Sequence, residues 1–172
     1  DYQCGALSFE IISGGKKLIC NSGYFRKKKH KLNEISKSSA NHSTLIIDNH
    51  SSCRINKTKM EVENGLKILE KEYFIKRNYW NVFASHDGYN KKYGIIHQRQ
   101  IEFFPENNKF IGTDKLIKKK NFKSSSFEIR FHLKPTAKIM KTQDGKSIFI
   151  DIDNEGWKFC SHGYTIDIET GL

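Results

Sequence analysis

The sequence has little proline, little arginine and no long apolar run. Proline accounts for 2 of 172 residues, and 25 of the 30 basic residues are lysine, which leaves 5 arginines. No stretch approaches the roughly 20 consecutive apolar residues that a membrane-spanning helix needs, so we predict no transmembrane segment here. Because specific recognition of phosphate or sulfate usually relies on the planar arginine fork, the scarcity of arginine counts against a dedicated reader of such groups.

Cysteine is present but shows no recognisable spacing. Cys4, Cys20, Cys53 and Cys160 form neither a CxxC pair nor a ladder, so neither a zinc ribbon nor a disulfide framework is predicted. Three of them, Cys4, Cys20 and Cys160, lie in or beside apolar alternating runs, where a cysteine behaves as a small buried apolar residue. This pattern leaves the redox environment of the protein open.

The net charge of +11 favours an anionic partner, and the classes to weigh are nucleic acid, membrane surfaces and acidic polysaccharides. A lysine-rich composition without any binding role is the alternative. Residues 26–41 and 118–126 each contain a lysine run followed by serines. We predict that both are solvated loops, the kind of segment on which binding surfaces are built.

Alternation of apolar and polar residues dominates the chain. Leu7, Phe9 and Ile11 alternate with polar neighbours, and the turn SGGKK then reverses the chain. Similar segments recur between Gly, Asn and Asp turns, as is typical of antiparallel strands; they include STLIID, NVFAS, GIIHQRQIEFF, KFIGTDKLI, SIFIDID and GWKFC. Residues 59–74 have some helical periodicity, but Gly65 interrupts it and we predict another hairpin there. The sequence thus predicts an all-β fold, a large antiparallel β-sandwich of roughly a dozen strands.

Five segments follow one another in a recognisable order: GALSFEIISGGKKLICNSGY, SSANHSTLIIDNHSS, ASHDGYNKKYGIIHQRQIEF, FEIRFHLKP and QDGKSIFIDIDNEGWKF. Together they resemble the C-terminal domain of the heparinase II/III-like family of polysaccharide lyases. The resemblance spans nearly all of residues 1–172, which we expect to form one β-sandwich domain of a longer protein. It implies an N-terminal α-helical toroid that packs against this domain and holds part of the active site.

The resemblance implies β-elimination on a uronic-acid-containing polysaccharide, such as a sulfated glycosaminoglycan or alginate. A base removes the proton α to the uronate carboxylate, a positive or hydrogen-bonding group stabilises the enolate, and an acid protonates the departing glycosidic oxygen. The implied partners are an acidic polysaccharide and the protein's own helical domain, and the implied location is periplasmic or exported. The alternative is a catalytically relaxed sandwich that binds carbohydrate or serves as a scaffold. A nucleic-acid partner is not predicted, because the basic runs lack the interleaved aromatic residues that stack bases.

The resemblance also implies where members of the family bind a metal ion. Zinc-containing members hold the ion with two histidines and an aspartate, at positions that match Gln3, Asn21 and His42 here. Only His42 is the family's residue type. Because neutral amide oxygens bind zinc poorly compared with imidazole and carboxylate, we predict neither zinc nor another cofactor.

Two residues are candidates for catalysis. His42 would bind or neutralise the uronate, as its family position implies; the alternative is a histidine hydrogen-bonded at the start of a strand. Tyr24, in the turn SGYF, would be the phenolic acid or base that such lyases use, since nearby cations ease the loss of its proton. The alternative for Tyr24 is a structural role, in which its ring packs over a glycine turn. Trp80 and Trp157 are predicted to be core residues rather than sugar platforms.

Six further residues are candidates for substrate binding. They are His86, Asp87 and Tyr89 of the motif HDGY, and Arg99, Arg130 and His132 on two strands. Asp-Gly is also a strong hairpin signal, so HDGY has a purely structural alternative. Alternation places Arg99 on the same face as His97, and Arg130 on the same face as His132. If the two strands share a sheet, these four residues form an anion-binding patch, and otherwise they belong to polar outer faces.

Overall fold

The computed structural model describes residues 3–23, 30–56, 58 and 61–170, so Tyr24 lies outside the described residues. The chain forms two compact units. The larger one contains Asp1–Phe9 and Asn21–Phe131, and the smaller one contains Glu10–Cys20 and His132–Leu172. Among the described residues, no helix has the length and apolar character needed to cross a membrane.

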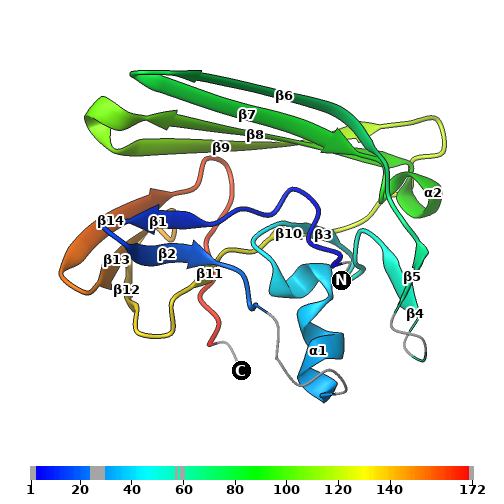
Figure 1. Cartoon of the computed structure of the whole chain (residues 1–172), viewed down its shortest axis with the longest axis horizontal. Coiled ribbons are helices and arrows are strands. Elements are labelled where there is room, and N and C mark those ends of the chain that lie inside the picture. Colours follow the sequence, from blue (N-terminus) through cyan, green and yellow to red (C-terminus); the bar gives the residue numbers. More distant parts are fainter. Residues whose placement is uncertain (1–2, 24–29, 57, 59–60, 171–172) are drawn as a thin grey trace. The chain divides into compact units, whose positions relative to one another are not determined.

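A four-stranded antiparallel sheet is the largest element of the larger unit. Its strands are β6 (Ile68–Lys76), β7 (Tyr79–His86), β8 (Ile95–Phe104) and β9 (Lys109–Lys118), in that order across the sheet. Figure 1 shows these four long strands side by side. β6 and β7 form a hairpin in which Lys76 pairs with Tyr79. The prediction of strands rather than a helix after Gly65 is therefore confirmed.

Shorter elements complete the larger unit. They are α1 (Lys31–Ser36), η1 (Ser39–Asn41), β3 (Leu45–Ile47), β4 (Arg54–Asn56), β5 (Glu61–Asn64), α2 (Asn90–Tyr93), η2 (Pro105–Asn107) and β10 (Phe127–Ile129). β3 pairs with β10 and β4 pairs with β5, both antiparallel. Leu45 and Ile47 of β3 form a hydrophobic core with Tyr89, Tyr93 and Ile95. Because burial of these apolar side chains fixes β3, the residues just before it are held in a defined position.

Two three-stranded antiparallel sheets make up the smaller unit. One contains β1 (Ile11–Ser13), β2 (Lys16–Cys20) and β11 (His132–Leu133), and the other contains β12 (Lys138–Lys141), β13 (Ser147–Ile152) and β14 (Glu155–Cys160). Alternation determines burial along β13: Ile148, Ile150 and Ile152 are buried, whereas Phe149 and Asp151 between them are exposed. The first sheet also contributes buried residues, namely Ile11, Leu18 and Ile19.

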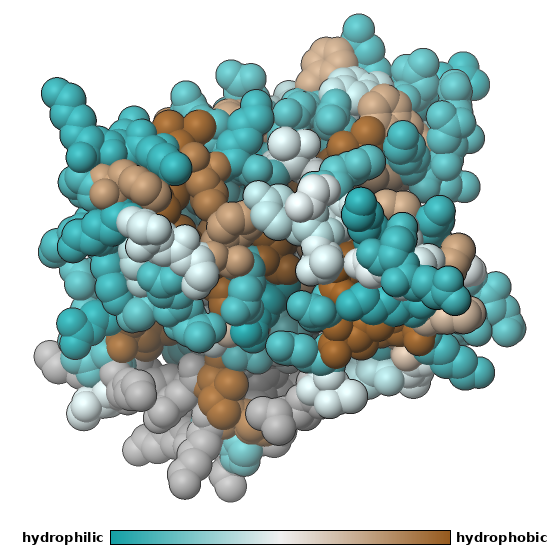
Figure 2. Space-filling model, turned by 180° about the vertical axis from the view of Figure 1, so that it is seen from behind, coloured by the Kyte–Doolittle hydropathy of each residue, from teal (hydrophilic) through white to brown (hydrophobic). Residues whose placement is uncertain are grey.

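The prediction of an all-β antiparallel fold is confirmed, and the sheets fit a β-sandwich. Two local predictions are wrong. Residues 26–41 were expected to form a loop, but they contain α1 and η1; His30 caps α1, because its Nδ1 accepts a hydrogen bond from the backbone N–H of Leu32 (3.3 Å). Trp80 is 45% exposed rather than a core residue, and its ring packs edge-on against Phe103 of the next strand. Figure 2 shows one face of the molecule, on which apolar side chains lie between hydrophilic ones.

Candidate functional site

His42 is the residue that retains the histidine implied by the family resemblance. It lies between η1 and β3 and is only 3% exposed. Its ring packs against Gly5, where a Cβ atom would lie 2.5 Å from His42 Cγ. This is well inside the roughly 3.5 Å at which carbon atoms normally make contact, so only glycine fits there without a shift. The segments GALSF and ANHST, which are distant in sequence, therefore meet at this pair.

Polar contacts bring a third segment to the same place. The side chain of Asn21 accepts a hydrogen bond from the backbone N–H of Ser43, which follows His42 (2.8 Å). The hydroxyl of Thr44 donates to the carbonyl oxygen of Ala6 (2.6 Å). The three segments that the resemblance links to one site thus converge around His42.

Arg99 connects these segments to the four-stranded sheet. It lies on β8 and is 4% exposed. Its Nη1 atom donates hydrogen bonds to the carbonyl oxygens of Leu7 (2.9 Å) and Ser43 (2.8 Å). Its Nε and Nη2 atoms donate to the two carboxylate oxygens of Asp114 on β9, at 2.8 and 3.1 Å. The planar guanidinium thus holds two backbone segments and one carboxylate at once, which the ammonium of a lysine cannot do in this geometry.

Two buried histidines extend this network along the sheet. The backbone N–H of Gly88 donates to Nδ1 of His86 (3.1 Å), and Nε2 of His86 lies 3.1 Å from Nδ1 of His97. Nε2 of His97 lies 2.5 Å from Oδ1 of Asp114. Since Gly88 must be the donor in the first bond, each imidazole in turn accepts at Nδ1 and donates from Nε2. One proton on each ring satisfies the whole chain, so both histidines are neutral and the charges are those of Asp114 and Arg99.

The surroundings shift the pKa values in agreement with this assignment. Burial, with smaller contributions from the neighbouring His97 and Arg99, lowers the pKa of His86 from 6.5 to about 3. Burial also lowers the pKa of His97, although Asp114 opposes that shift. Burial alone would raise the pKa of Asp114, but the hydrogen bond from His97 and the charge of Arg99 outweigh it and leave the pKa below its usual value. The carboxylate therefore stays ionised and the imidazoles stay neutral near pH 7.

We expect the protein to lose stability on acidification because of His86. In the unfolded chain its imidazole takes up a proton near pH 6.5, whereas in the folded protein it does so only near pH 3. The unfolded state therefore binds more protons between these values, and stability rises with pH across that window and is complete above it. Protonation of His86 alone, in the unfolded chain, therefore lowers the free energy of unfolding by about 2 kcal/mol when the pH falls from 8 to 5. Urea unfolding at both pH values measures the change.

Variants separate this effect from general acid sensitivity. His86→Asn should be less stable at pH 8 but should show a smaller difference between pH 8 and pH 5. His162→Asn is the control, because His162 is exposed and its removal should leave the difference unchanged. Equal stability of the wild-type protein at the two pH values would contradict the assignment.

The other residues of HDGY also have internal partners. Tyr89 is 1% exposed, and its hydroxyl donates to the carbonyl oxygen of Leu45 (2.8 Å); burial raises its pKa and keeps it protonated. Oδ1 of Asp87 accepts the backbone N–H of Lys67 (2.6 Å). The motif leads into α2 instead of forming a two-residue hairpin turn, so its expected turn type is wrong. Contact of His86, Asp87 and Tyr89 with substrate stays a prediction, and the geometry gives each of them a structural role.

The predicted patch of Arg99, His97, Arg130 and His132 does not form on one sheet. β8, which carries Arg99 and His97, belongs to the four-stranded sheet, whereas His132 lies on β11 of a three-stranded sheet in the smaller unit. The run FEIRFHL is interrupted between β10 and β11, and Arg130 lies in that interruption. Arg130 instead pairs with Glu128 (3.0 Å). The condition for the patch, a shared sheet, is therefore not met, and substrate binding by Arg130 or His132 individually stays a prediction.

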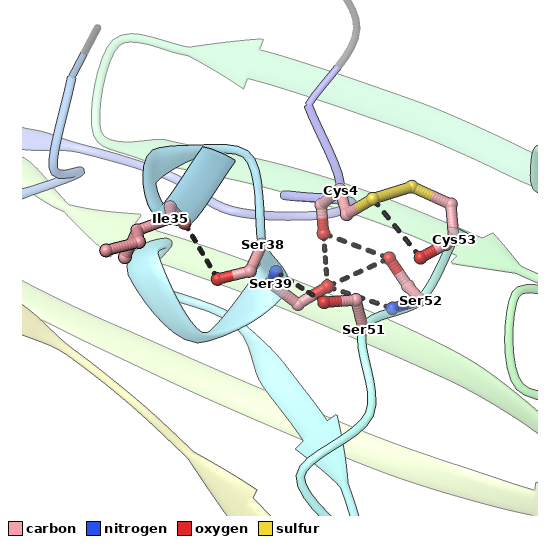
Figure 3. Close-up of a disulfide and its surroundings, with 7 residues drawn as sticks. All are labelled: Cys4, Ile35, Ser38, Ser39, Ser51, Ser52 and Cys53. Carbon is pink, nitrogen blue, oxygen red and sulfur yellow. Dashed lines mark hydrogen bonds between the residues drawn. A yellow bond between two sulfur atoms is a disulfide. The ribbon is translucent and has the colours of Figure 1, made fainter. Parts of the chain in front are cut away.

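A disulfide joins Cys4 to Cys53, a pairing that the cysteine spacing did not predict. Serine side chains surround it: the hydroxyls of Ser39 and Ser52 both donate to the carbonyl oxygen of Cys4, and the backbone N–H of Ser52 donates to Oγ of Ser39 (Figure 3). The backbone N–H of Cys4 also donates to the carbonyl oxygen of Lys37 (2.8 Å). The residue before Gly5 is thus attached to the segments on both sides of β3.

Sequence reasoning missed Asp114 and the disulfide partner Cys53. Asp114 stands in the strand segment KFIGTDKLI as the single acidic residue, directly across from Arg99 in the β8–β9 register. The sequence did hold a signal for Asp114: a carboxylate inside a strand that is predicted to be half-buried needs a cationic partner. For Cys53 the sequence held no comparable signal.

The fold and the converging segments define an all-β domain related to polysaccharide lyases. The chain belongs to the heparinase II/III-like family: residues 1–172 match the family described as Heparinase II/III-like, C-terminal. The resemblance predicted from the five segments is therefore confirmed. No curated protein and no solved structure matches the chain.

Proposed function

We propose that this chain is the C-terminal domain of a lyase that cleaves uronic-acid-containing polysaccharides by β-elimination, together with an N-terminal helical domain of the same protein. Membership of the heparinase II/III-like family across residues 1–172 carries the proposal. The geometry adds support, because His42, the one family metal position that keeps its histidine, lies where three family segments converge.

The reaction requires several groups, of which this domain supplies a part. A base takes the proton from the carbon next to the uronate carboxylate, the C–O bond to the leaving sugar breaks, a C=C bond forms, and the leaving oxygen gains a proton. We assign to His42 the binding or neutralisation of the uronate, which stabilises the developing enolate. The ring of His42 is buried against Gly5. Tyr24 stays the candidate acid or base, and we expect the remaining groups from the helical domain.

Zinc does not belong to this proposal, because the residues present do not fit it. Oδ1 of Asn21 already accepts the backbone N–H of Ser43 (2.8 Å), which is a structural use of the side chain. Gln3 and Asn21 offer only neutral amide oxygens where zinc prefers imidazole, thiolate or carboxylate. Among the described residues no group of three or more His, Cys, Asp or Glu side chains is placed to hold a metal ion. We therefore assign no step to a metal.

An exported or periplasmic location is part of the proposal. A lyase for large polymers must meet them outside the cytoplasm. The Cys4–Cys53 disulfide supports such a location, since disulfides form and persist in oxidising compartments and are rare in the cytosol.

A catalytically relaxed, carbohydrate-binding or scaffolding sandwich is the second candidate. It is favoured by the loss of the family residues at Gln3 and Asn21, the second of which is used to hold the backbone at Ser43. Unlike the lyase, such a domain would retain polysaccharide without cleaving it.

A spectrophotometric assay separates the two candidates. The full-length protein is mixed with a panel of acidic polysaccharides, and absorbance of the unsaturated uronate product is followed over time. We expect product formation by the wild-type protein and loss of at least about a hundredfold in rate for His42→Ala, the usual scale for removing one group that stabilises the transition-state charge. His162→Ala, which alters an exposed histidine, should keep full activity.

Unfolding curves of both variants accompany the assay, because His42 is buried. Loss of product with an unchanged unfolding midpoint supports the role of His42. Full activity of His42→Ala would exclude it. Binding of the wild-type protein to a polysaccharide without product on any member of the panel would favour the carbohydrate-binding candidate.

A further inference from the structure

Six exposed lysines lie on two segments of the larger unit that are distant in sequence. They are Lys91 and Lys92 in α2, Lys118 at the end of β9, and Lys119, Lys120 and Lys123 in the loop that follows. We call these six residues the lysine surface. Figure 1 shows α2 close to the chain that leaves β9.

Backbone hydrogen bonds fix the two segments against each other. The backbone N–H of Lys119 donates to the carbonyl oxygen of Gly94 (2.8 Å), and that of Lys123 donates to the carbonyl oxygen of Tyr93 (2.9 Å). The side chain of Asn121 donates to the carbonyl oxygen of Asn90 (3.2 Å). Gly94 ends α2 in the left-handed region, with φ of 65°, and a Cβ there would lie 2.5 Å from the backbone carbon of Asn121. The lysines are therefore gathered by a defined packing arrangement.

The charge of this surface is not neutralised locally. Residues 88–96 and 117–126 contain no aspartate or glutamate. Of the flanking carboxylates, Asp48 accepts hydrogen bonds from Ser126, and Asp87 accepts one from the backbone of Lys67. In the part of the chain that the structure describes, no ion pair joins any of the six ammonium groups to a carboxylate; the ion pairs of the other lysines there involve Lys16, Lys17, Lys134 and Lys141. Six like charges held together attract a polyanion and raise its local concentration.

We propose that the lysine surface binds acidic polysaccharide and holds the polymer on the domain. The identity of the polymer rests on the proposed function, whereas the charge and its placement do not. Lysine ammonium groups act as mobile point charges, which suits carboxylates or sulfates repeated along a flexible chain. Such a surface contributes to retention of long polymers and adds little to the handling of short oligosaccharides.

Nucleic acid fits this surface less well. Single-stranded binding depends on aromatic side chains on which bases stack. Of the two aromatic residues in these segments, Tyr93 is buried in the core, and Phe122 is exposed with the ammonium of Lys118 4.4 Å from its ring centroid. One exposed ring does not supply the series of aromatic platforms on which successive bases stack. Polysaccharide is therefore the partner that the surface favours.

The test compares two fourfold variants of the full-length protein with equal loss of charge. The first is Lys91→Gln, Lys119→Gln, Lys120→Gln and Lys123→Gln. The control is Lys71→Gln, Lys76→Gln, Lys109→Gln and Lys138→Gln, four exposed lysines. Lys76 and Lys109 belong to the end of the four-stranded sheet opposite Lys118, roughly 30 Å away along strands of ten residues. The probes are polygalacturonate, heparin and a DNA strand of equal charge, with Kd measured at low and physiological salt.

We expect the first variant to bind polygalacturonate or heparin at least about tenfold more weakly than wild type, since each exposed ion contact contributes modestly and four are removed. The control variant should stay within about threefold of wild type. Equal weakening in both variants would overturn the proposal, because it would indicate general attraction by net charge. Tighter binding of the DNA strand than of both polysaccharides would also overturn it, as would wild-type protein that binds neither polysaccharide.

Product assays keep this inference distinct from the proposed function. If the protein is a lyase, the first variant should show a raised KM for the polymer and unchanged kcat on short uronate oligosaccharides. If no product forms, lysine-dependent binding still supports the surface while the lyase assignment fails. Unchanged unfolding midpoints in both variants confirm that the substituted proteins are folded.

Discussion

Replacing Arg99 with methionine should lower the free energy of unfolding by about 3–5 kcal/mol, the usual cost of removing one partner of a buried ion pair. The substitution leaves the carboxylate of Asp114 without its bidentate partner in a buried position. It also leaves the carbonyl oxygens of Leu7 and Ser43 without the donor that now joins them. Urea unfolding followed by fluorescence measures the loss.

A double-mutant cycle shows whether the ion pair is responsible. Asp114→Leu alone should also be strongly destabilising, because it leaves a buried guanidinium unpaired. The double variant Arg99→Met with Asp114→Leu should be more stable than the sum of the two single changes predicts, since no isolated charge stays behind. Arg54→Met is the control: Arg54 pairs with Glu63 at the surface, and loss of an exposed pair changes stability little. Additive effects in the cycle would contradict the assigned pairing.

Arg99 also matters for the geometry of the candidate site. Its two backbone acceptors follow Gly5 and His42 at short distance in the sequence, and these two residues pack against each other. Loss of Arg99 should therefore loosen the contact between the segments even where the sheet survives. If the protein is a lyase, loss of Arg99 should therefore lower the rate of product formation, as His42→Ala does. If it is a scaffold, loss of Arg99 should lower only the stability.

The sequence predicted the strands well because one physical rule places them. Alternation with period two marks a strand with one buried side, and β13 follows the rule residue by residue, with its isoleucines buried and Phe149 and Asp151 between them exposed. The prediction of β6 rested instead on Gly65, which interrupts the helical periodicity, since all nine residues of β6 are exposed. Alternation could not place α1, a helix of six residues whose beginning depends on a cap from His30. Nor could it show that Trp80 lies on an exposed sheet face, because alternation does not say whether other residues cover that face.

Part of the candidate site was predictable, from the family resemblance and from alternation along one strand. The resemblance located His42, and alternation correctly placed His97 and Arg99 on one face of a strand, where both contact Asp114. What alternation could not supply is the register that sets Asp114 opposite Arg99. It also could not show that FEIRFHL divides between two sheets. Both depend on pairing between distant segments, on which a local pattern carries no information.

Removal of the Cys4–Cys53 disulfide should lower the free energy of unfolding by about 4 kcal/mol. The two cysteines are 49 residues apart, and in the chain-entropy model a closed loop of this length restricts the unfolded chain by that amount. The folded protein loses in addition a direct tie next to Gly5 and the serines around it. The double variant Cys4→Ser with Cys53→Ser, compared with wild type by urea unfolding, measures the loss.

Two controls make the disulfide result specific. Cys160→Ser removes an exposed cysteine that forms no disulfide and should leave the unfolding midpoint unchanged. Reducing the wild-type protein should lower its stability to that of the double variant, while the double variant itself should not respond to reductant. If wild-type protein from an oxidising compartment carries both thiols free, or if reduction leaves its unfolding unchanged, the bond does not stabilise the fold, and the support that it gives to an exported location disappears as well. If the expected loss is found, the segment that brings Gly5 to His42 depends on oxidation, and the protein reaches its full stability only where disulfides form.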